Sequence, residues 1–401
     1  MKKRFISAAI ALALCLCLLF SSNVLALDSY TSYGIDDLSF NDDGSFKIMQ
    51  IADLQNASTL NPAVKEFLRA ALESEKPDLV VLSGDNIAGE YLTGSLRYGQ
   101  LLQAKSAINQ FMSIFQEAGV PVALVFGNHD SYGLVSNEEQ MEIYQQYGVC
   151  IAIDQPDDVA EDLNGCGNYR VPIYGADGSE KFQLFFLDSG SDSPTKEGYA
   201  CVRQNQLDWL ESANDTAIPA MVFQHIIVPE IEDYLVPSSA DGSIKLNGKR
   251  YVLPSNATGV MNERPSPPTE DYEGEWAVLQ AQGNIQALVV GHDHTNNFVV
   301  PTGGVDIMNS TAIGMGAAAY NGNMDRGARI ITLKEDGSKY EERTLLFREL
   351  MTDPVSKLIL EWNCAGERGV TDEIATFFVN SFGTLLYPFV KFWNCLTGLF
   401  S

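Results

Sequence analysis

The chain has 401 residues, of which 52 are acidic, 26 are basic and only four are histidines. Its formal net charge of −26 gives the surface a field that repels long polyanions, which excludes an extended nucleic acid as a large-surface partner. A small phosphate could still enter a cleft lined by metal ions. The length suffices for one large domain with additions or for two domains.

Residues 1–26 have the features of a secretory signal peptide. The chain opens with three basic residues, an uncharged run follows from Phe5, and the residues up to Ala26 fit a cleavage site. A membrane helix is the alternative, but the apolar core is shorter than the ~20 residues that a span needs. We therefore expect the mature protein to be secreted or extracytoplasmic, with attachment to the cell surface as a further option.

The first half of the mature chain alternates strands and helices. Apolar runs at residues 46–53, 77–86 and 120–130 predict three strands. A helix is expected to begin at Asn61 and Pro62, and a longer amphipathic helix is expected around residues 101–115. Each of the three strands runs out into a carboxylate or an amide.

The second half of the chain has a different pattern. Residues 169–190 and 328–347 predict two hairpins around the turns ADGS and EDGS. Between them lie an expected helix and strand at residues 203–225 and another helix and strand at residues 275–294. The whole pattern favours a four-layer αββα sandwich, in which two mixed β-sheets are flanked by helices. Residues 230–275 are weakly patterned and read as a loop, either a substrate lid or a solvated insertion.

Polar residues follow five of the predicted strands, and all four histidines are among them. Because the carboxyl ends of strands converge in α/β sheets, these side chains can meet in one cleft. Taken singly, a lone histidine after a strand or a GDN or GNHD turn is an ordinary structural feature. Together, their nitrogen and oxygen atoms predict a site for Mn, Fe or Zn. The residues are Asp53, Gln55, Asp85, Asn128, His129, Asp130, His225, His292 and His294.

The motifs ADLQ, SGDN, GNHD, FQHIIVPE and GHDHTNNF, in this order, resemble the calcineurin-like metallophosphoesterase superfamily. The resemblance covers roughly residues 46–346. Within the superfamily, the chain is similar to the plant and fungal branch related to purple acid phosphatases. Those phosphatases carry a metal-ligating tyrosine three residues after the second aspartate of the series. Ala88 stands at that place here, so a tyrosine-ligated iron is not expected.

The resemblance implies a ligand set for two divalent or trivalent transition metal ions. Asp53 and His294 would bind the first metal and Asp85 would bridge the two metals. The second metal would be bound by Asn128, His225 and His292. Gln55 stands where the family usually has histidine. A glutamine carbonyl is a weaker ligand for Zn or Fe than imidazole, so the first site is expected to be looser or to favour Mn or Fe(II).

His129 is the one histidine that the resemblance leaves without a metal. It is suited to orient the phosphate or to protonate the leaving alkoxide, and Asp130 or another carboxylate is expected to fix its ring. We thus expect a catalytic domain over residues 27–348 that hydrolyses small phosphate esters, monoesters rather than diesters, through a hydroxide at the dinuclear centre. The alternative is a metal-binding surface protein with little or no activity, in which the first metal does not bind because Gln55 replaces a histidine ligand.

Residues 349–401 form an apolar C-terminal tail that poses a separate question. No charge occurs between Ile374 and Val390, a length at the lower edge for a membrane span. Gly383 and Pro388 weaken a continuous helix there. An interfacial helix, or a segment packed on the domain or on a partner, is the alternative to a spanning anchor.

Overall fold

The computed structural model describes residues 32–363, except 58, 94–95, 158, 160–162, 270–271 and 316–324, together with residues 379, 381 and 386. The predicted signal peptide and most of the predicted tail lie outside the described residues.

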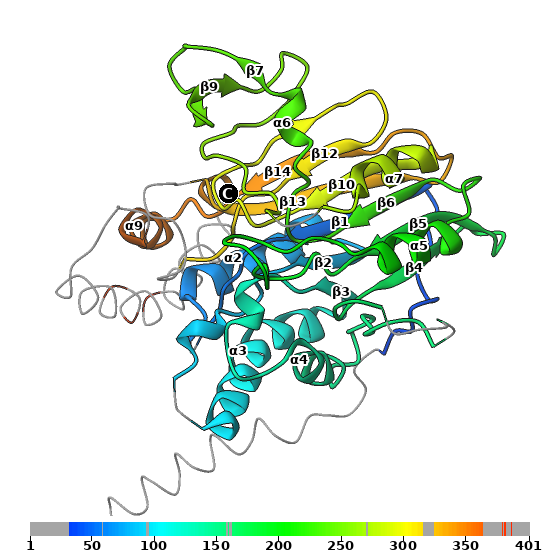
Figure 1. Cartoon of the computed structure of the whole chain (residues 1–401). Coiled ribbons are helices and arrows are strands. Elements are labelled where there is room, and N and C mark those ends of the chain that lie inside the picture. The colour runs from blue at the N-terminus through cyan, green and yellow to red at the C-terminus, as the bar shows by residue number, and fades with distance from the viewer. Residues whose placement is uncertain are drawn as a thin grey trace, which may run out of the picture.

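One sheet has five strands in the order β14-β13-β1-β2-β3 (Figure 1). The strands β1 (Ser45–Ile51), β2 (Leu79–Ser83) and β3 (Val122–Val125) are mutually parallel. The hairpin β13 (Gly327–Lys334) and β14 (Glu341–Leu346) joins antiparallel to β1. The parallel part places the carboxyl ends of β1, β2 and β3 at one edge.

The other large sheet has six strands in the order β11-β12-β10-β6-β5-β4. Its four central strands run parallel, and both edge strands run antiparallel. The strands are β4 (Tyr169–Tyr174), β5 (Glu180–Phe186), β6 (Ala220–Phe223), β10 (Ile285–Val290), β11 (Val299–Val300) and β12 (Asp306–Asn309). Both hairpins predicted from the sequence are therefore present, as β4–β5 and β13–β14.

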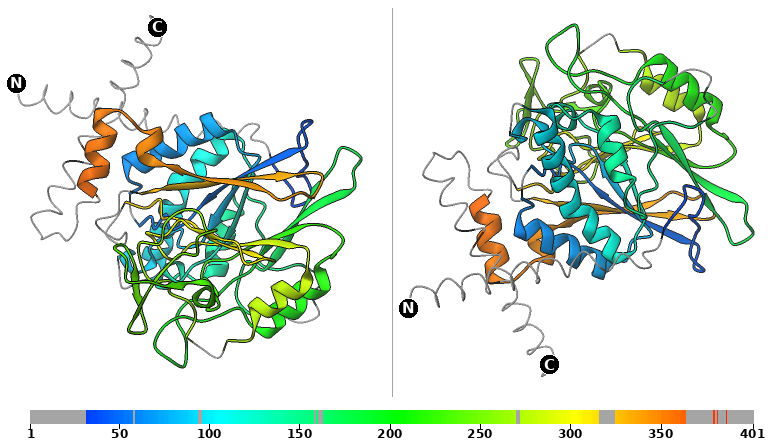
Figure 2. Two further views of the ribbon diagram at one scale, coloured as in Figure 1. Left: turned by 90° about the horizontal axis from the view of Figure 1, so that it is seen from above. Right: turned by 90° about the horizontal axis from the view of Figure 1, so that it is seen from below.

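The two sheets pack face to face with helices outside, which confirms the αββα sandwich (Figure 2). Strand β6 shows how the layers arise. Met221 and Phe223 point into the core between the sheets, while Val222 belongs to the apolar cluster on the sheet's other face. This alternation follows from the two-residue period of a strand. The helices over the first sheet are α2 (Pro62–Glu75), α3 (Arg97–Ala118) and α4 (Asn137–Tyr144), and those over the second are α5 (Gln204–Ala213) and α7 (Glu275–Gln282).

The ends of the first two helices follow ordinary capping rules. Asn61 caps α2, because its side-chain oxygen accepts a hydrogen bond from Ala63 N at 2.9 Å, and Pro62 occupies the first turn. Helix α3 stops at Gly119, which takes the left-handed conformation with φ 66°. The predicted helix start at Asn61 and Pro62 is thus confirmed.

The reading of residues 230–275 as a loop is wrong in part. After the short helix α6 (Ile231–Tyr234), the strands β7 (Val236–Pro237), β8 (Ile244–Leu246) and β9 (Lys249–Val252) form a small three-stranded sheet. Its strands of two to four residues are too short to show a period in the sequence. The pair Asn247-Gly248 between β8 and β9 was the available signal, since both residues have positive φ, as a two-residue hairpin turn requires.

The first part of the predicted tail continues the domain. Helices α8 (Phe347–Leu350) and α9 (Pro354–Asn363) follow β14, and Ile359 and Leu360 of α9 are buried in the main core. Within the described ranges, no helix combines the length and apolarity that a membrane crossing requires. The uncharged segment 374–390 lies outside the described residues apart from three positions, so its membrane or partner contact stays a prediction.

Candidate metal centre

The residues predicted to bind metal lie in loops that directly follow the strands. Asp53, Asp85 and Asn128 come after β1, β2 and β3 of the five-stranded sheet. His225 and His292 come after β6 and β10 of the six-stranded sheet. The site is therefore formed where the carboxyl ends of parallel strands from both sheets meet.

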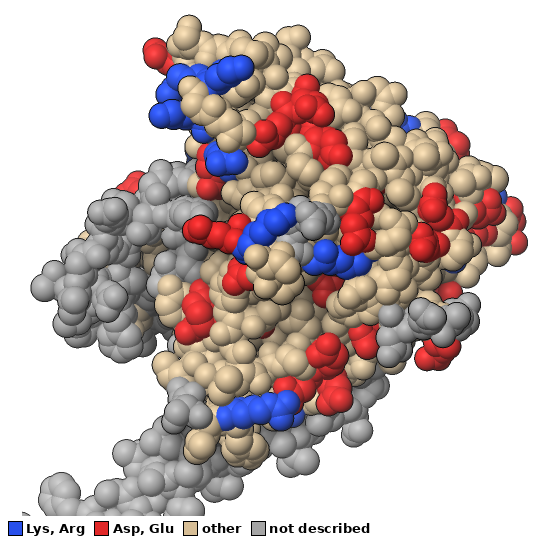
Figure 3. All heavy atoms as spheres, in the orientation of Figure 1, with Lys and Arg blue, Asp and Glu red and all other residues tan. Residues whose placement is uncertain are grey.

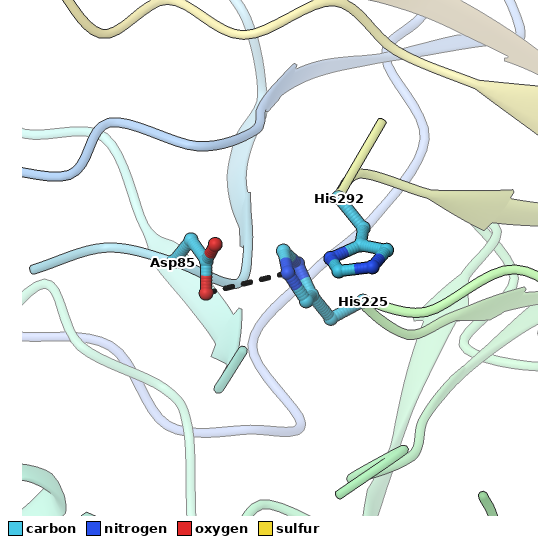
Figure 4. A group of neighbouring side chains, drawn as sticks. All are labelled: Asp85, His225 and His292. Carbon is cyan, nitrogen blue, oxygen red and sulfur yellow. Dashed lines mark ion pairs between the residues drawn. The ribbon is translucent and has the colours of Figure 1, made fainter. Parts of the chain in front are cut away.

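The structure gathers these side chains into two groups that share one carboxylate. We call Asp53, Asp85 and His294 the first group, and Asp85, His225 and His292 the second group (Figure 4). In each group, one nitrogen or oxygen atom of every residue lies within 4.8 Å of those of the others, and all members are buried. Within this arrangement His225 Nε2 lies 3.3 Å from Asp85 Oδ1, and His294 Nε2 lies 3.3 Å from Asp53 Oδ1. Asp85 is thus placed to contact two cations.

The backbone at these positions is held in an unusual conformation. Six non-glycine residues in the described ranges have positive φ, and four of them are Asp53, Gln55, Asp85 and His292, with φ from 47° to 70°. The backbone of non-glycine residues rarely adopts this region. Such strained conformations occur mainly at functional sites. Three of these four residues, Asp53, Asp85 and His292, belong to the two ligand groups.

Unsatisfied buried atoms at the site fit metal ions. Among the described residues, Gln55 Oε1 and Asn128 Oδ1 are buried and have no hydrogen-bond partner. His225 Nδ1 lies 2.9 Å from Ser83 O, so a proton on Nδ1 leaves the lone pair of Nε2 directed at the second group. Carboxylate, imidazole and amide atoms together form a donor set that Mn, Fe and Zn accept.

Charge interactions at the site depend on Asp85. Burial raises its pKa, but the neighbouring histidines, His225 foremost, outweigh burial and hold the pKa well below its usual range. Burial lowers the pKa of His292, which keeps that ring neutral and able to bind a metal. Burial alone would also lower the pKa of His225, but the charge of Asp85 raises it to about 10. A bound cation would compete with that proton.

Gln55 lies inside the first group with its amide nitrogen inward. Nε2 donates to Asp85 Oδ2 at 3.2 Å and lies 3.3 Å from His294 Nε2. Metal binding by Gln55 requires the oxygen instead, and a half turn of the amide would exchange the two atoms. Whether Gln55 binds a metal therefore stays a prediction.

His129 lies beside the second group and is oriented by Glu90. Its Nδ1 is 2.7 Å from Glu90 Oε1, and its Nε2 is 3.9 Å from Asp85 Oδ2. Burial lowers the pKa of His129, but the hydrogen bond to Glu90 and the charge of Asp85 outweigh burial and raise it. Glu90 is thus the carboxylate that fixes the ring.

Asp130 has a different position from the one expected of a partner for His129. Its carboxylate accepts hydrogen bonds from the backbone N–H groups of Asn86, Ile87 and Gly127, at 2.8 to 3.2 Å. The side chain is buried and ties the loop after β2 to the loop after β3. This geometry makes Asp130 a support for the two loops, and its predicted catalytic role has no contact with the His129 ring to carry it.

Several residues around the site were missed in the sequence. Tyr132 packs on His129 with ring centroids 4.9 Å apart, and Tyr199 packs edge-on to His292 at 4.3 Å. Glu90 could have been suspected, because it follows Asp85 in the same loop. No local signal marks Tyr199, since its loop reaches the site only through the fold. Ala88, at the position of the family's tyrosine, is buried and offers no ligand atom.

The candidate lid is partly fastened to the site. The backbone N–H groups of Asn262 and Glu263 both donate to Asn296 Oδ1, and Asn262 Nδ2 donates to Thr295 O.

The small sheet formed by β7, β8 and β9 carries basic side chains, whereas acidic ones are spread over much of the face in view (Figure 3). These basic residues are Lys245, Lys249 and Arg250.

Comparison with known proteins gives a match along most of this fold. The model of the calcineurin-like phosphoesterases matches residues 46–296. A protein of Arabidopsis thaliana named probable inactive purple acid phosphatase 28 is 30% identical over 341 residues, covering 74% of this chain and 77% of its own. Another, named probable inactive purple acid phosphatase 14, is 29% identical and covers 80% of this chain and 81% of its own.

More distant similarities extend to yeast and to solved structures. The phosphatase DCR2 of Saccharomyces cerevisiae is 25% identical, with 66% of this chain and 46% of that protein covered. A dimetal phosphatase from Danio rerio is 14% identical with a TM-score of 0.46, covering 75% of this chain and 98% of its own. At that identity and score, the structural likeness does not bear on the function.

Proposed function

The chain belongs to the calcineurin-like phosphoesterase family, and from this premise we propose that it hydrolyses small phosphate esters, monoesters in preference to diesters. The observation that carries the proposal is the pair of buried ligand groups sharing Asp85. Burying a carboxylate among histidines while nearby amide oxygens lack hydrogen-bond partners is unfavourable. A bound cation would remove this cost, whereas a purely structural role for Asp85 would not.

The proposed cofactors are two transition metal ions, Mn, Fe or Zn. The first group would hold one ion, and Gln55 would join it after a turn of its amide. The second group, together with Asn128, would hold the other. When bound, the two ions supply positive charge for the phosphoryl oxygens and lower the pKa of a water molecule toward neutrality.

The residues around the ions would supply orientation and a proton. Glu90 holds His129 Nδ1, which leaves Nε2 as the atom that can donate to a phosphoryl oxygen or to the departing alkoxide. Tyr132 limits the motion of the ring by packing on it. The His129–Glu90 pair is therefore assigned to the leaving-group side of the reaction.

A second candidate function is metal binding without appreciable catalysis. Two observations favour it: Gln55 replaces an imidazole ligand, and the two Arabidopsis relatives described above carry the words probable inactive in their names. In this case the second group would bind its ion while the first group remained weak.

A paired assay separates these functions. Protein reconstituted with Mn would be given p-nitrophenyl phosphate and, separately, its bis ester, alongside Asp85→Asn as the inactive control. We expect faster release from the monoester by the wild type and loss of release in the variant. No turnover of either ester by protein that holds two ions per chain would leave only the binding function.

We also propose that the protein is exported, since residues 1–26 have the pattern of a signal peptide. Expression of the full chain should yield a mature form that starts near Leu27 outside the cytoplasm. Retention of residues 1–26 on intracellular protein would contradict this.

A further inference from the structure

Three side chains form a hydrogen-bonded series that ends at a proposed metal ligand. Asn128 Nδ2 lies 3.0 Å from the hydroxyl of Tyr132, and this hydroxyl lies 2.8 Å from Asp192 Oδ1. Asn128 follows β3, Tyr132 lies four residues further along, and Asp192 lies in the loop between β5 and α5. The series therefore joins loops from the two different sheets.

The chemistry of these groups fixes the direction of each hydrogen bond. A carboxylate only accepts, and a phenol has a single proton to donate. Tyr132 therefore donates to Asp192 and must accept from Asn128. It follows that the amide nitrogen of Asn128 faces Tyr132 and that the amide oxygen faces the opposite way.

The amide oxygen is the atom that a metal would need. Asn128 Oδ1 is buried and has no hydrogen-bond partner among the described residues. Both chain neighbours of Asn128 approach Asp85: His129 N donates to Asp85 Oδ1 at 2.8 Å, and a Cβ on Gly127 would lie 2.3 Å from the same oxygen. The unsatisfied oxygen thus belongs to a segment that lies against the shared carboxylate.

The loop that carries Asp192 contacts this side of the site at two more points. Ser191 Oγ donates to the backbone oxygen of Asn128 at 3.3 Å. Further along, Tyr199 packs edge-on to His292 at a centroid distance of 4.3 Å. Both contacted residues are proposed ligands of the second metal, and neither contact reaches the first group.

We propose that Tyr132, oriented by Asp192, is a positioning residue that presents the oxygen of Asn128 to the second metal and keeps the amide from turning over. This inference deepens the proposed function and rests on its metal site. Without the phenol oxygen, nothing accepts the hydrogen bond from Asn128 Nδ2, so the amide can turn and direct toward the metal an N–H group that cannot bind it.

The test uses metal binding rather than activity. Mn²⁺ would be titrated calorimetrically into the metal-free full-length protein as wild type, Tyr132→Phe and Asp192→Asn. The matched control is Tyr98→Phe, which removes the hydroxyl of a tyrosine that is 70% exposed on α3. We expect both test variants to weaken one of two Mn²⁺ sites by about tenfold or more, as loss of outer hydrogen-bond partners does at other metal sites.

Two further measurements separate positioning from general damage. Unfolding temperatures in chelator should be the same for all four proteins, because Tyr132 is partly exposed and its ring remains in Tyr132→Phe. The double variant should be no worse than Tyr132→Phe alone, since both changes break one series. Unchanged Mn²⁺ affinities in Tyr132→Phe would overturn the inference and leave the proposed function intact. A wild type that binds no Mn²⁺ would overturn both.

Discussion

Gln55 is the residue on which the strength of the first metal site depends. Its neutral amide lies among the carboxylates and the imidazole of the first group, donating to Asp85. An amide that donates to the shared carboxylate stabilises the metal-free state, and it must break that hydrogen bond before its oxygen can bind. The first site thus lacks one strong ligand and also has a competing interaction.

Replacing this glutamine should strengthen the first site. In Gln55→His, an imidazole nitrogen takes the place of the amide, and we expect the weaker of the two Mn²⁺ affinities to increase about tenfold, or ~1.4 kcal/mol. Metal content per chain after dialysis measures the change. Gln146→His, at an exposed position just after α4, is the control. Equal metal content in all three proteins would show that Gln55 is not at a metal site.

Glu90 is expected to act through His129 alone. The charge of Glu90 holds His129 Nδ1 and raises the pKa of His129. Glu90→Gln removes this charge, so a smaller fraction of His129 carries the proton and proton donation to the leaving group should weaken. We expect kcat for p-nitrophenyl phosphate to fall about 10- to 100-fold, within the range of general acid catalysis, while the bound Mn stays constant. A fall in metal content of the same size would instead place Glu90 in the metal centre. Glu142→Gln, on α4, provides the exposed control.

At the scale of single elements, the loop after β2 packs so closely that it requires glycine. Gly84 has φ 92°, and a Cβ there would lie 2.4 Å from His225 Nδ1. The short turn between β2 and Asp85 and the position of the His225 ring are thus coupled. A side chain at residue 84 would push the ring away from the second group.

Gly84→Ala should therefore lose the second metal. We expect its Mn²⁺ affinity at one site to drop by about 100-fold or more, since a ligand is displaced rather than merely loosened. Gly178→Ala is a close control: its φ of 75° carries similar backbone strain, but a Cβ there meets nothing within 4 Å. If both variants bound Mn²⁺ equally, steric contact with His225 could not be the reason for the glycine.

Helix α7 contributes a pH dependence to stability through its first residue. Glu275 is buried, and burial raises its pKa from 4.5 to about 8. Between these values the folded chain holds a proton that the unfolded chain has released, so the free energy of unfolding falls as the pH rises from about 5 to 8. Glu275→Gln cannot titrate and should lose part of this fall.

Unfolding temperatures of wild type and Glu275→Gln, measured from pH 5 to 8.5, test this directly. The free energy of unfolding of Glu275→Gln relative to the wild type should increase from low to high pH, by up to a few kcal/mol. The exposed Glu73→Gln on α2 should run parallel to the wild type. A constant difference between Glu275→Gln and wild type would mean that Glu275 is ionised throughout.

At the scale of the whole molecule, the sequence predicted the features that follow a regular pattern along the chain. The strand and helix periods predicted the αββα sandwich, and strand-end polar residues predicted that Asp85, His225 and His292 would meet. Features that depend on how distant segments fold together were missed. Asp192 comes from a loop of the other sheet and accepts a hydrogen bond from Tyr132, and strands of two to four residues such as β8 carry too little pattern. Glu90 lies between these cases, because its loop was known but the direction of its side chain was not.

The metal centre also has a consequence for the stability of the whole fold. The first sheet supplies Asp53 and Asp85 and the second supplies the three histidines of the ligand groups, so bound ions would link the two sheets at one end of their interface. Between the sheets, apolar side chains already hold the layers together. At the ligand end, buried carboxylates face each other, and a cation would relieve their repulsion.

Removal of metal should therefore lower the unfolding temperature of the entire domain rather than loosen one loop. Protein with Mn²⁺ at 100 times its dissociation constant gains about 2.7 kcal/mol, which corresponds to roughly 4 °C for a domain of this size. Differential scanning calorimetry with Mn²⁺ and with chelator measures this shift as a single transition. Asp85→Asn lacks the shared ligand, so its unfolding temperature should respond little to Mn²⁺. If wild type and Asp85→Asn gained the same stability from Mn²⁺, the ion would be binding to the acidic surface instead of between the sheets.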